Sequence, residues 1–238
     1  MSNRFYRPEL PAEGQFRLDA DESKHLLRVS RREVGDRVEV FDGRGLSVLA
    51  RVVGRDGNLA VLEAEGPPIL EPTPVCSIEI GAAVPKGDRF DWLVEKAVEL
   101  GVARLVPLIT ERSVVDPRGS KLDRLRRAII EASKQSGRSR LMELSPSIGL
   151  RSFLETPGGV RLLADPRGEP AESWPRIVRG AAVRLVVGPE GGLTDAETAL
   201  AEGLGWTPVR LGAHILRVET AVLAGAAAIL ARLEAPPA

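Results

Sequence analysis

The sequence predicts an α/β protein with a small β-barrel domain at its N-terminus and a larger C-terminal domain built on a parallel sheet. Short alternating or β-branched runs, separated by turn signals, fill the first part of the chain. A proline-rich stretch follows, and beyond it strands and helices alternate. Such alternation is typical of a parallel sheet with helices on both faces. The two domains are expected at residues 1–70 and 75–238.

The N-terminal domain is expected to contain four short strands and one helix. Turn signals at Asp42–Gly45 and Arg55–Asn58 separate the later strands. The helix is expected over Asp21–Arg31. This pattern indicates a β-barrel of about 65 residues, a size at which such domains can fold alone. The expected strands are Gln15–Leu18, Arg37–Phe41, Ser47–Val53 and Leu59–Ala64.

Four prolines within Gly66–Pro74 mark the boundary between the domains. Proline lacks an amide hydrogen and fixes its own φ, so this stretch is a stiff connector. Beyond it, the expected strands are Val75–Val84, Ala103–Ile109, Val160–Ala164, Val183–Val187 and Pro208–Leu211. The expected helices are Asp88–Leu100, Lys121–Gln135, Thr194–Leu204 and Glu219–Leu233. Thr194 and Glu197 have the spacing of a capping box.

The composition indicates a soluble protein of the reducing cytoplasm. Cys76 is the single cysteine, so no internal disulfide can form. Residues 1–10 lack the apolar core of a secretory signal, and no apolar stretch is long enough to span a membrane. One cysteine and two histidines leave little material for a zinc site, so no metal is expected.

The formal net charge is zero, but the basic residues form two clusters. Together these clusters fit a protein that contacts a polyanion on one face. Either cluster alone is more typical of a solvated helix face. The first comprises Lys24, Arg28, Arg31, Arg32 and Arg37, and the second Arg118, Lys121, Arg124, Arg126, Arg127, Lys134, Arg138 and Arg140.

Three loops follow apolar strands in the C-terminal domain: Ala164–Gly168, Gly188–Gly192 and Leu211–Ala221. Ligands of open parallel sheets lie beyond the carboxyl ends of the strands, so these loops are the expected binding site. Glycines in the second loop let backbone groups approach a ligand closely, whereas a tight turn alone needs about one of them. The loop matches neither the dinucleotide fingerprint nor a phosphate-binding P-loop.

Arg217 and Glu219 stand where the last expected helix begins. The helix dipole explains a carboxylate at this position. Arg217 is flanked by Leu216 and Val218, and an arginine in such an apolar stretch usually has a specific partner. A purely structural role therefore explains Arg217 less well than it explains Glu219.

Short motifs along essentially the whole chain share the order and spacing of a known family. They are Asn3–Tyr6, His25–Val29, Phe41–Gly43, Lys86–Arg89, Glu95–Gly101, Pro107–Leu108, Glu111–Arg112, Glu131–Arg140, Gly188–Gly192, Leu211–Gly212 and Ile215–Ala221. Together they resemble the RsmE family, which methylates N3 of a uridine in small-subunit (16S) ribosomal RNA. Two places depart from the pattern: Ala213-His214 where the family commonly has Pro-Arg, and Val218 where it often has Thr or Ala.

The resemblance implies a PUA-like RNA-binding β-barrel domain and a SPOUT methyltransferase domain with a deep trefoil knot, an exception to the usual absence of threaded chains. It also implies a homodimer, S-adenosylmethionine as cofactor, and 16S ribosomal RNA, within the small ribosomal subunit, as substrate. The residues implied for cofactor binding are Ala164, Asp165, Gly188, Pro189, Glu190, Gly191, Gly192, Leu211, Gly212, Ile215, Leu216 and Thr220.

Methylation of uridine N3 requires that its proton leave, which calls for a base near N3 and a cation near the uracil oxygens. Our hypothesis assigns Arg217 the electrostatic role and Glu219 a role as base or positioning residue, with Glu190 as the competing carboxylate. RNA phosphates are expected to contact Arg28, Arg31, Arg32, Arg124, Arg127, Lys134, Arg138 and Arg140.

Two alternatives stay open. A methyltransferase of the same fold could act on another RNA position, and no motif reports the substrate atom. An RNA-binding assembly factor without catalytic activity is the alternative from a different class, although the intact glycine loop Gly188–Gly192 argues against it. A Rossmann oxidoreductase is disfavoured because the dinucleotide fingerprint is absent.

Overall fold

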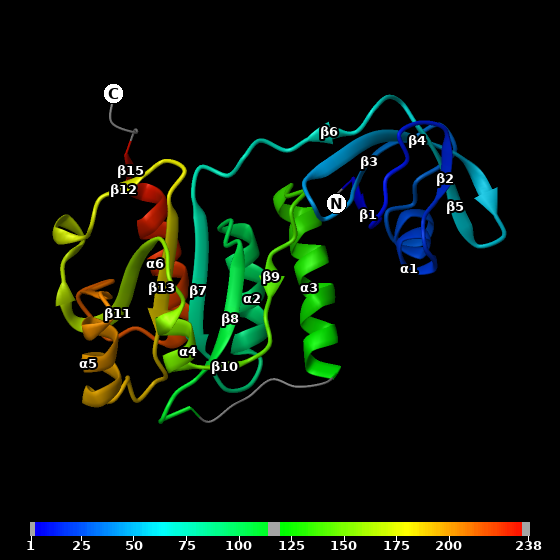
Figure 1. Cartoon of the computed structure of the whole chain (residues 1–238). Coiled ribbons are helices and arrows are strands. Elements are labelled where there is room, and N and C mark those ends of the chain that lie inside the picture. The colour runs from blue at the N-terminus through cyan, green and yellow to red at the C-terminus, as the bar shows by residue number, and fades with distance from the viewer. Residues whose placement is uncertain (1–2, 114–119, 235–238) are drawn as a thin grey trace. The chain divides into compact units, whose positions relative to one another are not determined.

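The computed structural model describes residues 3–113 and 120–234. Arg118 of the second basic cluster lies outside these residues. The chain divides into two compact units (Figure 1). The first comprises the chain up to Thr73 together with Ile129–Leu141, and the second comprises Pro74–Ala128 and the chain from Met142 on. The segment Ile129–Leu141 thus belongs to the first unit, although the sequence analysis assigned it to the C-terminal domain.

The first unit is built on a six-stranded sheet of order β1-β3-β4-β5-β2, in which β6 pairs with β4. Its strands are β1 (Arg4–Tyr6), β2 (Gln15–Arg17), β3 (Arg37–Phe41), β4 (Leu46–Asp56), β5 (Leu59–Ala64) and β6 (Ile69–Leu70). Pairing is antiparallel except between β1 and β3. Helix α1 (Ala20–Lys24) continues into a π-helical turn over His25–Val29. The four predicted strands and the predicted helix are confirmed.

A buried ion pair joins Ile129–Leu141 to the rest of the first unit. Lys134, whose side chain is 1% exposed, donates hydrogen bonds to Glu22 and, at 2.8 Å, to Glu131. The other carboxylate oxygen of Glu22 accepts from the amide of Tyr6 at 3.1 Å. Burial raises the pKa of Glu22 despite the hydrogen bond from Lys134. The pair therefore places a charged contact inside the unit, where its removal is costly.

Arginines strengthen the same attachment. Arg4 is buried and donates to the Ser139 hydroxyl at 2.7 Å and to Glu39 at 3.1 Å. Arg140 lies against the loop after β3, where a Cβ at Gly45 would stand 2.5 Å from the guanidinium carbon. Gly45 has φ +109°, a conformation that favours glycine, and any side chain there would also have to displace the Arg140 guanidinium.

The second unit contains the predicted parallel sheet. Its strand order is β10-β8-β7-β13-β11-β14, with β9 paired to β8, and every pairing is parallel. These strands are β7 (Ser77–Ala83), β8 (Arg104–Ile109), β9 (Glu143–Leu144), β10 (Ile148–Gly149), β11 (Val160–Glu169), β13 (Ala182–Val187) and β14 (Thr207–Val209). A separate parallel pair joins β12 (Ile177–Val178) to β15 (Leu233–Glu234).

The helices of the second unit are α2 (Arg89–Glu99), the start of α3 (Ser120–Ser136), α4 (Leu150–Glu155), α5 (Asp195–Gly203) and α6 (Val218–Ala231), with a 3-10 turn at Ala171–Ser173. Neighbouring strand residues point to opposite faces of a sheet. Leu185 of β13 meets α6 so closely that a Cβ at Gly225 would clash with it. Val186 instead joins a buried cluster with Phe153 of α4. Helices therefore cover both faces, as the sequence predicted.

Residues 3–113 and 120–234 lack two features. None of their helices is long and apolar enough to cross a membrane. They also contain no group of three or more His, Cys, Asp or Glu side chains that could hold a metal ion.

We predict that Lys134→Met lowers the free energy of unfolding by about 3–5 kcal/mol, because it leaves the buried carboxylate of Glu22 unpaired. The double variant Glu22→Gln/Lys134→Met should recover much of this loss. Denaturant unfolding followed by circular dichroism measures both. Arg127→Met, at an exposed position of α3, is the control and should change stability by no more than about 0.5 kcal/mol. Equal effects of Lys134→Met and the control would contradict the prediction.

Candidate functional site

The three loops identified in the sequence leave the parallel sheet at one edge. Ala164 of β11 pairs with Val187 of β13 on one side and with Val209 of β14 on the other. Because the strands are parallel, the residues that follow this row emerge together beyond the carboxyl ends. The structure thus brings the predicted loops side by side.

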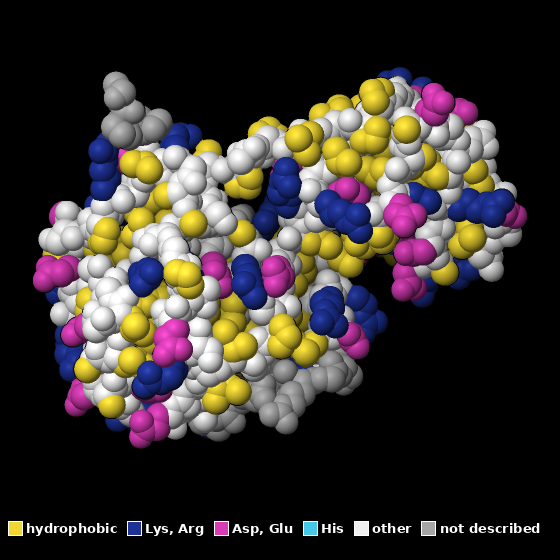
Figure 2. All heavy atoms as spheres, viewed as in Figure 1, with side chains coloured by type: hydrophobic (Ala, Val, Ile, Leu, Met, Phe, Trp, Pro, Cys, Tyr) yellow, Lys and Arg dark blue, Asp and Glu magenta, His cyan; other side chains and the backbone are white. Residues whose placement is uncertain are grey.

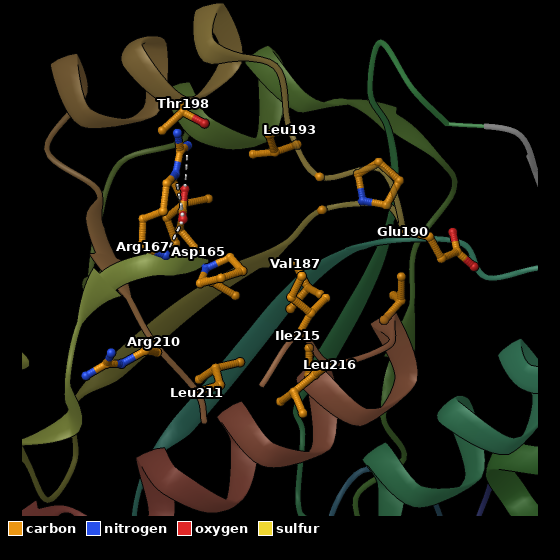
Figure 3. A pocket seen from close by; sticks show the side chains of 18 of the residues that line it. Asp165, Arg167, Val187, Glu190, Leu193, Thr198, Arg210, Leu211, Ile215 and Leu216 are labelled. Carbon is orange, nitrogen blue, oxygen red and sulfur yellow. Dashed lines mark hydrogen bonds and ion pairs between the residues drawn. The ribbon is translucent and has the colours of Figure 1, made fainter. Parts of the chain in front are cut away.

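These loops surround a cavity of about 470 Å³, within the range of about 300–1,000 Å³ typical of small-molecule sites. Figure 3 shows Asp165 and Arg167 on one side of it, Glu190 on the opposite side and Val187 between them. Aliphatic side chains are the largest group in the lining, and six of its residues are charged: Arg112, Asp165, Arg167, Glu190, Asp195 and Arg210. Its aliphatic members are Leu163, Ala164, Val187, Leu193, Val209, Leu211, Ile215, Leu216, Val218 and Ala221.

All the residues predicted to bind a cofactor line this cavity except Thr220, which is exposed on α6. Leu163, Val187 and Val209 also line the cavity but were not predicted to bind a cofactor, because the prediction did not extend to these strand residues. Arg112, which follows β8, was likewise given no role at this site. Ligands of parallel sheets bind beyond the carboxyl ends of the strands, and this principle, applied to β8, would have identified Arg112.

The glycine loop Gly188–Gly192 is shaped by its backbone. A Cβ at Gly188 would approach Leu193 Cγ to 3.1 Å, and Gly192 has φ +70°. Backbone geometry thus accounts for Gly188 and Gly192, whereas a tight turn alone was expected to need about one glycine. Arg112 Nη1 donates to the Gly191 carbonyl at 2.6 Å, which ties the loop to the residues after β8.

The predicted capping box at the start of α5 is confirmed. The Glu197 carboxylate accepts from the Thr194 amide at 2.8 Å, and the Thr194 hydroxyl accepts from the Glu197 amide at 3.3 Å. Glu197 also accepts from the amide of Glu111 at 2.9 Å. The helix that follows the glycine loop is therefore fixed at its first turn and is tied to the residues after β8.

Asp165 and Arg167 form the charged side of the cavity. Arg167 Nε and Nη2 donate to the two oxygens of Asp165 at 3.2 and 3.1 Å. Burial alone would raise the pKa of Asp165, but the hydrogen bonds from Arg167 outweigh it and lower the pKa. Asp165 therefore stays ionised at neutral pH and can accept a hydrogen bond from a ligand hydroxyl or amino group.

The two predicted catalytic residues differ in environment. Arg217 is exposed at the N-cap of α6, and no partner for it is found within the described part of this chain. Glu219 lies in the first turn of α6, and its side chain is 9% exposed. Its Oε2 is buried and has no hydrogen-bond partner in the part of the chain that the structure describes.

Arg89 lies between the two carboxylates that the sequence analysis compared. Its Nη1 is 3.6 Å from Glu190 Oε1 and 3.8 Å from Glu219 Oε1. Sequence reasoning gave Arg89 no role, although it lies in a motif of the family resemblance. Spacing along the chain could not show that α2, the glycine loop and α6 converge on one guanidinium.

The predicted RNA-contacting residues of the first unit are not equally accessible. Arg28 and Arg31 are exposed, and Arg32 and Arg140 are half-buried. Lys134 is buried against Glu22, so its charge does not reach the surface. The hypothesis that Lys134 contacts phosphate therefore conflicts with its burial in this structure.

Arg138 and the exposed residues of α3 complete the predicted set. Arg138 is half-buried, and burial lowers its pKa. In the second unit, Arg124 and Arg127 are exposed on α3, and Arg124 pairs with Asp91 at 2.5 Å. Figure 2 shows basic and acidic side chains interspersed on each unit, with no continuous basic surface on the face in view.

Comparison with known proteins gives matches over most of the chain. Residues 71–230 match the family described as RNA methyltransferase domain, and residues 18–65 match RNA methyltransferase PUA domain. Ribosomal RNA small subunit methyltransferase E of Synechocystis sp. is 34% identical over 95% of this chain and 76% of that protein. The enzyme of that name from Mycobacterium bovis is 33% identical over 95% of this chain and 91% of its own length.

Solved structures of similar proteins agree with these sequence matches. A ribosomal RNA small subunit methyltransferase E from Neisseria gonorrhoeae, bound to S-adenosyl methionine, is 33% identical with a TM-score of 0.88, and the match covers 97% of each chain. A Legionella pneumophila structure in complex with the same cofactor is 28% identical, also with a TM-score of 0.88, over 97% of this chain and 98% of that one.

The fold, the cavity and these matches define an RNA methyltransferase with an N-terminal PUA domain. Within that class, the chain belongs to the ribosomal RNA small subunit methyltransferase E family. The resemblance of the sequence motifs to the RsmE family is thereby confirmed.

We predict that Gly192→Ala lowers the free energy of unfolding by about 1–2 kcal/mol, because an L side chain is strained at φ +70°. The matched control is Gly203→Ala at the end of α5, where φ is not positive and no atom lies within 4 Å of the added Cβ. That variant should gain about 0.4–1 kcal/mol. Equal effects in denaturant unfolding would show that the conformation of Gly192 is not constrained.

Proposed function

We propose that this chain transfers a methyl group from S-adenosylmethionine to N3 of a uridine in small-subunit (16S) ribosomal RNA. The observation that carries the proposal is the cavity at the carboxyl ends of β11, β13 and β14, in a chain that belongs to this methyltransferase family. The Neisseria gonorrhoeae relative, whose fold matches over 97% of each chain, is bound to the same cofactor.

The cavity fits such a cofactor in size and chemistry. Aliphatic side chains such as Leu211 and Leu216 would hold the adenine, and Asp165 would accept hydrogen bonds from hydroxyl groups. Backbone groups of Gly188–Gly192 would hold polar parts that side chains cannot approach. The bound cofactor supplies the electrophilic methyl group, so the protein contributes positioning and electrostatics.

Uridine N3 becomes nucleophilic only when its proton leaves, and negative charge then spreads onto the two neighbouring carbonyl oxygens. Arg217 supplies positive charge at one of these oxygens. Glu219 acts as the base or as a positioning residue, and Glu190 is the competing carboxylate. The exposure of Arg217 at the N-cap of α6 leaves its charge available to a substrate.

Ribosomal RNA binds through its phosphates to basic side chains of both units. The accessible candidates are Arg28, Arg31, Arg32, Arg124, Arg127, Arg138 and Arg140. The match of residues 18–65 to a PUA domain of RNA methyltransferases supports the role of the first unit.

Family membership supports four further parts of the proposal. The catalytic domain lies within residues 75–238 and forms a trefoil knot, and an RNA-binding domain at 1–70 precedes it. The active protein is a homodimer. Its partner is 16S ribosomal RNA within the small ribosomal subunit. The reaction takes place in the cytoplasm.

Calorimetric titration tests the cofactor assignment. We expect saturable binding of S-adenosylmethionine and S-adenosylhomocysteine but not of NADH. Gly188→Val should weaken binding, because even its Cβ would approach Leu193 Cγ to 3.1 Å, so the larger side chain must displace Leu193, which lines the cavity. Absence of binding at millimolar cofactor, in a demonstrably folded protein, would leave an RNA-binding protein without this activity.

Methylation of small-subunit ribosomal RNA, read by mass spectrometry of nucleosides, tests the reaction. Arg217→Ala should lower kcat by about 10²–10³-fold while cofactor affinity is retained, because the arginine acts on developing charge. Product at another atom of the RNA would redirect the proposal to a different modification, and unchanged turnover would remove Arg217 from the mechanism.

Salt dependence of RNA binding tests the basic residues. Arg28→Gln/Arg127→Gln should weaken binding, and the slope of log K against log salt should fall by about 1 for each phosphate that the variant no longer neutralises. Arg151→Gln is the control, since this exposed arginine on α4 pairs with Glu155. The same slope in the double variant and the control would exclude phosphate contacts by these two residues.

A further inference from the structure

Arg89 is the first residue of α2, and three elements of the second unit converge on it. Its Nη1 faces Glu190 of the glycine loop at 3.6 Å and Glu219 of α6 at 3.8 Å. Its Nε donates to the Lys86 carbonyl at 3.3 Å. Both ion-pair distances are longer than hydrogen bonds. With its side chain 37% exposed, the guanidinium can still donate to a bound group.

Exposure separates the two carboxylates that share Arg89. The side chain of Glu190 is 44% exposed, whereas that of Glu219 is 9% exposed. A proton acceptor must come within hydrogen-bond distance of the substrate atom that it deprotonates. Glu190 lines the cavity and is open to such an approach. Glu219 Oε2 is buried and closed to it.

The burial of Glu219 gives this carboxylate a different role. A buried carboxylate needs a compensating cation, and Arg89 is the cation found beside Glu219 in the part of the chain that the structure describes. The same Nη1 atom also faces Glu190, so the ion pair with Glu219 keeps the guanidinium beside a residue that lines the cavity.

We propose that Arg89 is a further catalytic residue, which donates a hydrogen bond to a uracil oxygen beside N3. Glu219 is the positioning residue that holds Arg89, and Glu190 takes the N3 proton. This inference rests on the proposed function. Uracil N3 lies between two carbonyl oxygens, so Arg89 and Arg217 can each stabilise one of them as charge develops.

In the step, the N3–H bond breaks and its proton moves to the Glu190 carboxylate. The electron pair on N3 forms the bond to the methyl carbon, and the electron pair of the carbon–sulfur bond stays on sulfur. The proton on Glu190 is then released to water. Arg89 takes no part in the proton transfer and stabilises the anionic uracil by its hydrogen bond.

A double-mutant cycle tests the coupling of Arg89 with Glu219. Arg89→Met and Glu219→Gln should each lower kcat by about 10²-fold. The double variant should be no slower than the slower single variant, because both substitutions remove one function. Arg89→Lys should recover part of kcat by restoring a cation. Cofactor affinity by calorimetry, KM for RNA and the melting temperature should stay close to wild type in all of them.

Arg104 provides a matched control. It is 44% exposed, lies at the opposite end of the sheet as the first residue of β8, and also faces two carboxylates, Glu79 at 3.6 Å and Glu143 at 3.1 Å. Arg104→Met should leave kcat unchanged. A comparable fall in kcat for Arg104→Met would show that removal of any such ion pair disturbs the enzyme, and would overturn the proposal.

Other outcomes of these measurements also test the proposal. Wild-type kcat in Arg89→Met, or losses that multiply in the double variant, would overturn the coupling while leaving the proposed function intact. A loss confined to cofactor affinity or melting temperature would make Arg89 a structural residue. Near-wild-type kcat in Glu190→Gln would remove Glu190 as the base. A wild-type protein that forms no methylated uridine would overturn the proposed function and this inference with it.

Discussion

Ala164 pairs with Val187 and Val209 in the two neighbouring strands, and the position of the cavity follows from this row. Parallel strands that end at the same level release their chains at one edge, so three loops far apart in sequence meet there. Beyond Ala164 the register of β11 against β14 shifts, and Glu169 again pairs with Val209. Asp165, Pro166 and Arg167 lie between these two pairs, are freed from regular pairing with β14 and line the cavity.

Burial, rather than sequence position, decides what the charged residues of the first unit do. Lys134 lies within a basic run, yet it is enclosed with Glu22. Arg4 is likewise buried against Glu39 and Ser139. These contacts join Ile129–Leu141 to α1 and β1, more than a hundred residues away in sequence. A charge run is therefore a mixture of solvated side chains and structural cations, which composition alone does not separate.

The sequence predicted the regular elements well, because their signals are local. The strands β3 and β5 have the predicted bounds, and the capping box of Thr194 and Glu197 depends on four consecutive residues. Short elements were missed, among them β1, β9, β10 and α4, since two to six residues carry too little periodicity. The continuation of β11 to Glu169 was also missed, because Pro166 and Gly168 interrupt the strand pattern.

For the candidate site, loops could be predicted but contacts between them could not. The rule on carboxyl ends identified Gly188–Gly192 and its neighbours without any three-dimensional information. Arg89 and Arg112 act on that loop from α2 and from the residues after β8. Their partners depend on which strands are adjacent, and strand order does not follow sequence order in this sheet. Long-range ion pairs of this kind have no local signature.

The same long-range contacts hold the loops around the cavity in place. Arg112 holds the Gly191 carbonyl, and Glu197 holds the amide of Glu111, so the glycine loop and α5 are tied to one segment after β8. Arg167 fixes Asp165 on the opposite side. Ordering loops on binding weakens affinity, and a site whose loops are already fixed avoids much of that loss. The glycines at Gly188 and Gly192 then serve a fixed backbone conformation that a ligand can approach closely, and not the flexibility often attributed to glycine-rich loops.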